Sequence, residues 1–143
     1  MSAEQHKKVD IATCQLETAI RLFFYGGDHY AVLTLAGAAD EILGQILKAL
    51  EKEPALHSFA RSYALVMHAL YNEQLDEREI QRQANAARNS VKHFNSFNEL
   101  TVTFDAREEA VRMISRAIEN HKALRLPPSE EIERFEKYYE EHY

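Results

Sequence analysis

Apolar residues along the chain recur mainly at steps of three and four, the spacing that places them on one face of an α-helix. The first such segment covers residues 8–25, and its apolar positions are Val9, Ala12, Leu16, Ala19, Ile20 and Phe23. Gly26 and Gly27 predict the end of this helix, and Asp28 is placed to cap the start of the next one. The pattern therefore predicts an amphipathic first helix followed by a tight turn.

The second segment, residues 29–53, has apolar side chains around well over half of its helical circumference. A helix that is apolar on so many sides needs neighbours on several of them, so this one is predicted to lie at the centre of a bundle. Pro54 ends it, because proline lacks the amide hydrogen that a helix interior needs.

Two further helices are predicted for residues 56–71 and 76–94. The buried stripe of the second one consists of Ile80, Ala84, Ala87, Val91 and Phe94. Residues 95–104, NSFNELTVTF, include β-branched side chains that suit a strand, but nothing else in the chain could pair with one. We therefore expect an extended connection there.

The last part of the chain predicts two more helices. Asp105 and Glu108 have the spacing of a capping box and open a fifth helix that continues through Ile118. A final helix is expected after residues 127–128, two prolines, with Ser129 as its cap. The sequence thus predicts an all-α fold: a single-domain bundle of four to five main helices in residues 1–126 and an amphipathic C-terminal helix in residues 127–143. That last helix suits either packing within the chain or an arm around a second subunit.

Composition narrows the class of protein. The chain has 143 residues, 45% of them hydrophobic and 28% charged, as in an ordinary globular domain. Its net charge of −6 argues against a protein that binds nucleic acid over its whole surface, and no DNA contact is expected. The polar N-terminus, the lack of a long apolar run and a single cysteine, Cys14, favour the cytoplasm and no membrane contact.

One stretch, AARNSVKHFN at residues 86–95, departs from the acidic character of the chain. It brings together Arg88, Asn89, Lys92 and His93, and no acidic residue occurs between positions 80 and 98. On a helix through residue 94, these four side chains would lie opposite the apolar stripe, over an arc of roughly 140°. Arg78 and Arg82 would share that polar side. The pattern predicts a local cationic strip on an acidic body.

These residue types are suited to a phosphate group. Arginine offers a planar fork of donors that matches two phosphate oxygens, and histidine can gain or lose a proton near neutral pH. An imidazole could take the proton of a ribose 2′-hydroxyl as it attacks phosphorus, while the arginine stabilises the developing charge. The plainer interpretation is an ordinary solvated helix face, on which such side chains are common.

The motif Arg88-Asn89-x-x-x-His93 resembles the signature of HEPN domains, in which an arginine and a histidine are four to six residues apart and a polar residue follows the arginine. The resemblance extends to about Leu126. It implies an all-α bundle in which two protomers pair so that their motifs face one cleft. Many members of this family are metal-independent ribonucleases, and some of these are toxins of toxin–antitoxin pairs. An antitoxin protein would then be a partner.

Two other pairs in the chain meet the same bare spacing, Arg61 with His68 and Arg116 with His121. Arg88 is the only one of the three arginines that an amide residue follows, and it alone lies in an acid-free segment with a second cation. We therefore choose Arg88 and His93 as the catalytic pair, with Asn89 as a third catalytic residue that holds the imidazole or the phosphate in place. Lys92, Arg82 and Arg78 are predicted to bind the substrate. His68 and His121 are interpreted as ordinary bundle histidines.

Asp40 stands out on the second helix, at the edge of its apolar face and between Gly37 and Gly44. A carboxylate there is costly unless it is paired, and the two glycines leave room for another group to approach. We hypothesise that Asp40 pairs with Arg88 or His93 and supports the site. The alternative is a structural ion pair without a role in chemistry.

No pair of histidines has the close spacing of two metal ligands on one helix face, and one cysteine cannot form a structural zinc site, so no metal or other cofactor is expected. A second class of function stays open beside the ribonuclease. In it, the same strip binds a nucleotide, RNA or a partner protein without catalysis, and His93 carries no proton.

Overall fold

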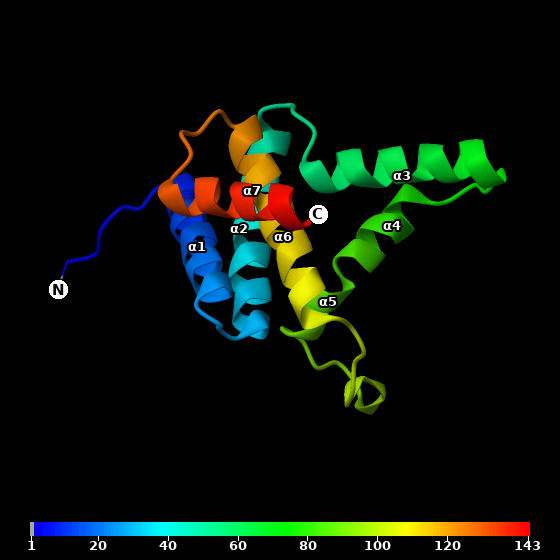
Figure 1. Ribbon diagram of the computed structural model, residues 1–143, viewed down its shortest axis with the longest axis horizontal. Coiled ribbons are helices and arrows are strands. Elements are labelled where there is room, and N and C mark those ends of the chain that lie inside the picture. The colour runs from blue at the N-terminus through cyan, green and yellow to red at the C-terminus, as the bar shows by residue number, and fades with distance from the viewer. Residues whose placement is uncertain (1) are drawn as a thin grey trace.

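The computed structural model describes residues 2–143, and its regular structure in this range is entirely helical (Figure 1). In chain order the elements are α1 (Lys8–Phe24), α2 (His29–Ala49), α3 (Ala55–Tyr71), α4 (Glu77–Ala84), α5 (Ala86–Ser90), the 3₁₀ helix η1 (Phe97–Glu99), α6 (Ala106–Ala123) and α7 (Glu130–His142). The all-α prediction is confirmed. The expected central position of the second helix is confirmed too, because α2 packs against both α1 and α6.

The hydrophobic core lies between α1, α2, α6 and α7. In Figure 1, α1, α2 and α6 run side by side, and α7 crosses the face of this layer. From α7, Ile132 and Phe135 are fully buried in the core. The ring of Phe135 meets that of Phe23 edge to face, with 5.7 Å between centroids. The apolar side of α7 is therefore used within its own chain.

Several helix ends are where the sequence placed them. The side chain of Asp28 accepts hydrogen bonds from the first turn of α2, Asp105 accepts one from the backbone N–H of Glu108, and Ser129 caps α7. Side-chain oxygens at these positions replace the carbonyl partners that the first turn of a helix lacks.

The second helix is shorter than expected, since α2 ends at Ala49 and not at residue 53. Glu51 adopts a left-handed backbone conformation, with φ of 58°, and the N–H of Lys52 bonds back to the carbonyl of Leu47. This arrangement closes the last turn of a helix. Pro54 consequently precedes α3 and does not itself stop α2.

The fourth predicted helix, residues 76–94, is wrong in its extent. It breaks at Asn85 into α4 and α5, and α5 ends at Ser90. Phe94, expected in the buried stripe, is 59% exposed, and its ring packs against that of Phe97. Together α3, α4 and α5 (residues 55–90, the arm) form an excursion in which α3 leads away from the bundle and α4 leads back (Figure 1).

Within residues 2–143, α2 is the one helix long and apolar enough to cross a membrane by length and composition. Half of the residues in that apolar window are buried inside the bundle. The window also contains Asp40, whose side chain accepts hydrogen bonds from two residues of α6. The apolar surface of α2 thus serves the contacts with α1 and α6.

Candidate functional site

The site begins with Asp40, a carboxylate on the buried side of α2 that is only 5% exposed. Its Oδ2 accepts a hydrogen bond from Nη2 of Arg116 at 2.8 Å, and its Oδ1 accepts one from Nδ2 of Asn120 at 3.0 Å. Both partners belong to α6 and are four residues apart, so they lie on the same face of that helix. A buried carboxylate is tolerated only when it is paired and hydrogen-bonded in this way.

The same two partners connect Asp40 to the arm. Oδ1 of Asn120 accepts a hydrogen bond from the backbone N–H of Ala55 at 2.8 Å, at the first residue of α3. Nη2 of Arg116 donates a second hydrogen bond, at 2.6 Å, to Oδ1 of Asn85. Because Asn85 lies between α4 and α5, the hydrogen-bond network around Asp40 holds the first residue of the arm and its α4–α5 junction against the bundle.

Arg88 reaches this cluster from α5. Its Nη1 lies 3.8 Å from Oδ2 of Asp40, which is an ion-pair distance but too long for a hydrogen bond. The side chain is only 11% exposed, and its Nε is buried without a hydrogen-bond partner within residues 2–143. The hypothesis that Asp40 pairs with Arg88 is confirmed as an ion pair, whereas the closer partner of the carboxylate is Arg116.

A glycine on α2 makes this position of Arg88 possible. A Cβ added at Gly37 would lie 2.4 Å from Cδ and 2.7 Å from Cγ of Arg88. At Gly44 an added Cβ would meet its nearest atoms at 3.6 Å, which is ordinary contact. Of the two glycines that flank Asp40, only Gly37 is therefore required for the arginine to cross α2.

The cluster holds two guanidinium groups and one buried carboxylate. Burial lowers the pKa of Arg88, and the positive charge of Arg116 lowers it further, while Asp40 and the exposed Glu41 act in the opposite direction. Arginine nevertheless stays protonated at any physiological pH. The three buried side chains therefore carry an excess of positive charge and unused hydrogen-bond donors.

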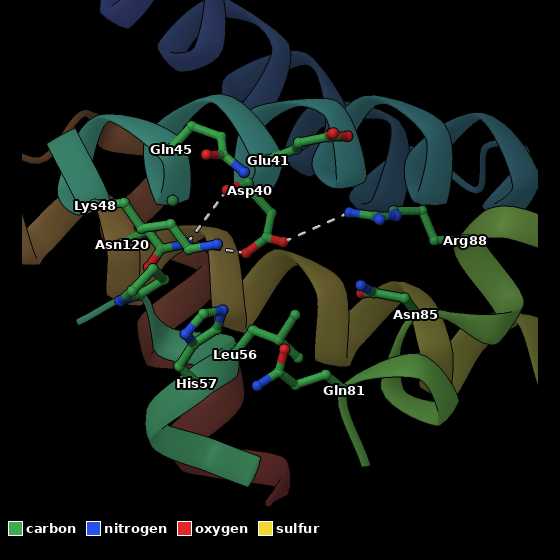
Figure 2. Close-up of a pocket in the computed structure, with 12 residues that line it drawn as sticks. Asp40, Glu41, Gln45, Lys48, Leu56, His57, Gln81, Asn85, Arg88 and Asn120 are labelled. Carbon is green, nitrogen blue, oxygen red and sulfur yellow. Dashed lines mark hydrogen bonds and ion pairs between the residues drawn. The ribbon is translucent and has the colours of Figure 1, made fainter. Parts of the chain in front are cut away.

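A pocket of about 200 Å³ opens beside this cluster, at the junction of α2 with the arm (Figure 2). In the figure, the side chains of Asp40, Asn120, Gln81 and His57 converge on it, with Arg88 at one end. The residues that line it are Asp40, Glu41, Gly44, Gln45, Lys48, Pro54, Leu56, His57, Gln81, Asn85, Arg88 and Asn120. Most of these can donate or accept a hydrogen bond, so the pocket fits a polar ligand.

The structure separates the other members of the predicted strip from this pocket. Asn89, Lys92 and His93 are exposed, and none of them lines it. The backbone N–H groups of Lys92 and His93 both bond to the carbonyl of Asn89, which adds one turn beyond the end of α5. The expected arc on one continuous helix is therefore wrong, because regular helix ends at Ser90. The hypothesis that His93 pairs with Asp40 is also wrong.

The arginines of α4 contribute less positive surface than the sequence suggested. Arg78 and Arg82 are both exposed, but Nε of Arg82 donates a hydrogen bond to Oε2 of Glu79 at 2.8 Å. Glu79, which directly precedes the acid-free residues 80–98, thus pairs with an arginine inside that stretch. On this helix Arg82 is already neutralised by a neighbour.

The two other Arg–His pairs of the sequence, Arg61 with His68 and Arg116 with His121, do not form sites of their own. Arg61 pairs with Glu53 at the surface, and His68 is exposed on α3. His121 is buried in the bundle, as expected, but Arg116 belongs to the Asp40 cluster. Arg116 and Asn120 are the site residues that the sequence argument missed. The available signal was an arginine and an asparagine, four residues apart, along one edge of the apolar stripe of α6.

Comparisons of the chain with protein-family models, with curated proteins and with solved structures found no significant match.

Proposed function

We propose that the protein is a metal-independent endoribonuclease in which Arg88 binds the scissile phosphate and His93 transfers a proton. The observation that carries the proposal is the state of Arg88: a largely buried guanidinium with a partnerless Nε and no hydrogen bond to its nearest carboxylate. Donors left unsatisfied inside a protein are costly, so an acceptor from outside is expected there. A phosphate offers oxygens that match the fork of a guanidinium.

Charge supports the same assignment. Arg88 and Arg116 share the single buried carboxylate of Asp40, so an anion beside Arg88 would balance the excess positive charge. The guanidinium is held in place before any ligand arrives, by Gly37 on one side and the Asp40 cluster on the other. Donors fixed in advance in this way stabilise a transition-state charge without reorganisation.

His93 lies on the turn that follows α5, five residues after Arg88, and its exposed side chain is free to meet a substrate. With a rise of 1.5 Å per residue, that separation corresponds to roughly 7–8 Å along the helix path. A phosphodiester bound at Arg88 would thus extend toward His93. The same spacing is what makes the motif resemble HEPN ribonucleases.

The proposed reaction needs the RNA, water and the side chains of Arg88 and His93. His93 takes the proton of a ribose 2′-hydroxyl, the 2′-oxygen forms a bond to phosphorus, and the bond from phosphorus to the 5′-oxygen breaks. The leaving 5′-oxygen takes a proton from water, and the protonated His93 returns its proton to the solvent. Arg88 stabilises the charge on the phosphorane oxygens, and the products carry a 2′,3′-cyclic phosphate and a 5′-hydroxyl.

In this proposal the protein acts in the cytoplasm as a homodimer, in the manner of a toxin with an antitoxin protein as its partner. Asn89 and Lys92, exposed beside His93, would contact the RNA backbone. Arg78 would add a weaker contact from α4. No DNA and no membrane contact are proposed.

A second candidate is non-catalytic binding of a nucleotide or RNA, and it is favoured by a specific observation. Arg88 lines the pocket beside Asp40, whereas His93 does not. A ligand seated in the pocket could thus use Arg88 together with the amides of Gln45, Gln81 and Asn85, and leave His93 unused.

The test is cleavage of total cellular RNA by the purified protein in excess EDTA. The wild type is compared with His93→Ala, with Arg88→Lys and with His68→Ala, a control that removes an exposed histidine from the arm. Fragments with 2′,3′-cyclic phosphate ends are expected from the wild type and the control, none from His93→Ala, and a rate lower by on the order of 100-fold from Arg88→Lys. Failure of the folded wild type to cleave RNA would overturn the ribonuclease. RNA binding that depends on Arg88 alone would then select the second candidate.

A further inference from the structure

α3 carries large apolar side chains that no other part of residues 2–143 covers. Only Ala55 and Ala60 of this helix are buried. Phe59 is 50% exposed, Tyr63 43%, Val66 52% and Leu70 68%. We refer to these four residues as the α3 seam. In Figure 1, α3 extends away from the layer of α1, α2 and α6, which leaves the seam without a neighbour from the core.

The seam follows the spacing of a helix that packs against another helix. Its members are separated by four, three and four residues, the repeat that coiled-coil positions show. At 100° per residue they fall within an arc of about 60°. Ala60 and Met67, which face the rest of the chain, lie to one side of this arc, and Leu65 lies on the far side of the helix. The rings of Phe59 and Tyr63 are in contact along the seam, with centroids 5.9 Å apart.

No charged group interrupts this surface. Arg61 is the only Lys, Arg, Asp or Glu residue in α3, and it is paired with Glu53 away from the seam. A chain with a net charge of −6 repels its own copies, so contact between copies requires an uncharged surface of this kind. A partner protein recognised through charge would find no complementary group here.

The size of the seam fits the core of a dimer interface. Half-exposed side chains of these types offer about 100 Å² each, or on the order of 400 Å² per copy for the four together. A stable interface buries about 800 Å² per partner, with an apolar centre and a more polar rim. The seam would supply the centre, and flanking side chains such as Ser62 would supply part of the polar rim. An area of this size is in the range of the largest apolar patch on a typical monomer, about 300–600 Å², and such a patch is often a functional contact surface.

We propose that α3 pairs with α3 of a second copy in an antiparallel arrangement. The spacing of the seam reads the same in both directions, so a two-fold axis at its midpoint places Phe59 opposite the partner's Leu70 and Tyr63 opposite the partner's Val66. A parallel pair would bring two acidic bundles together at one end, because each bundle holds the first residue of its α3 through Asn120. The antiparallel pair puts them at opposite ends.

The contact rests on the proposed function only for the homodimer that it would form, because each site acts with its own Arg88 and His93. The contact itself is measured without RNA. Sedimentation velocity of the wild type over a range of concentrations is expected to give a dimer. Tyr63→Asp combined with Val66→Asp places carboxylates beside each other at the axis and is expected to give a monomer with an unchanged circular dichroism spectrum. Leu65→Asp changes an equally exposed apolar residue outside the seam and is expected to stay dimeric.

A wild type that is folded and monomeric would overturn the pairing and leave the tests of Arg88 and His93 unaffected. So would a dimer that persists in the Tyr63 and Val66 double variant. The orientation is tested in a Cys14→Ser background. Ser62→Cys together with Ala69→Cys should form a covalent dimer on oxidation, because these positions face each other across an antiparallel pair. Each single cysteine should not, and the absence of cross-linking in the double variant would overturn the antiparallel arrangement.

Discussion

The side chain of Arg88 lies across α2 directly over Gly37, where a Cβ would stand 2.4 Å from the Arg88 Cδ. The contact involves the middle of the arginine side chain, so a small shift of its tip cannot relieve it. Any larger residue at position 37 must therefore move the guanidinium away from Asp40. Because Gly37 lacks a side chain, the guanidinium of Arg88 can lie beside Asp40.

Gly37→Ala is predicted to abolish the function of Arg88 with little loss of stability. Crowding costs about 1–3 kcal/mol, but the preference of helices for alanine over glycine offsets about 1 kcal/mol of it. The free energy of unfolding should thus fall by no more than about 2 kcal/mol, while RNA cleavage falls to the level of Arg88→Lys. Urea denaturation and the EDTA cleavage assay measure the two quantities. Gly44→Ala, where the nearest atoms are 3.6 Å away, is the matched control and should keep both.

Asp40→Asn is predicted to be strongly destabilising. The substitution removes the only carboxylate that accepts the hydrogen bond of Arg116 in the buried cluster and leaves two guanidinium groups close together. Loss of one partner from a buried ion pair costs about 3–5 kcal/mol, and we expect a decrease of this size in the unfolding free energy. Glu41→Gln, one residue further along α2 and exposed, is the control. Equal stability of the two variants would show that the cluster does not hold α6 and the arm to α2.

His121 predicts a pH dependence of stability. Burial lowers the pKa of its imidazole, and the weaker effect of Glu17 opposes that shift. The unfolded chain therefore takes up a proton near pH 6.5, while the folded chain does so only at lower pH, so stability is lost as the pH falls below about 6.5. The loss is complete once the pH is below the folded pKa. Urea midpoints between pH 7.5 and 5 measure it.

In the same measurement, His121→Gln should show a smaller decrease in stability on acidification than the wild type. The comparison is between slopes against pH, since the substitution of a buried side chain also lowers stability at every pH. His68→Gln, an exposed histidine on α3, serves as the control and should keep the slope of the wild type. Identical slopes for all three proteins would remove His121 as the source.

Lys92 and Arg82 are predicted to differ in their contribution to RNA binding. Lys92 is exposed and has no ion-pair partner within residues 2–143, whereas Arg82 is bonded to Glu79. For single-stranded RNA, each phosphate contact contributes about 0.7 to the slope of log affinity against log salt, and Lys92→Ala should lower the slope by about that amount. Arg82→Ala should change it less. Fluorescence anisotropy with the inactive His93→Ala protein at several salt concentrations measures both slopes.

Sequence periodicity was sufficient for the helices of the bundle, since α1, α2 and α6 each bury a stripe with a clear three-and-four repeat. It also identified Asp40, because a carboxylate on an apolar face needs a partner. It did not identify the break at Asn85. That break coincides with a hydrogen bond from Arg116, which is 31 positions away in the sequence. A local pattern carries no information about such a contact.

The placement of His93 was wrong for a related reason. Counting 100° per residue assumes an uninterrupted helix, but α5 has only five residues and ends at Ser90. Short helices depend on tertiary contacts more than on their own sequence. The direction of α3 was equally hidden, because its apolar positions satisfy the same repeat whether a neighbour covers them or not.

The core cluster draws its members from α1, α2, α6 and α7, and none from the arm. Hydrogen exchange should therefore divide the molecule into two parts, with slow exchange in the four core helices and faster, local opening in α3 and α4. Substitutions in the arm can accumulate without a loss of the core on which folding depends. The arm and the core are consequently open to change at different rates in evolution.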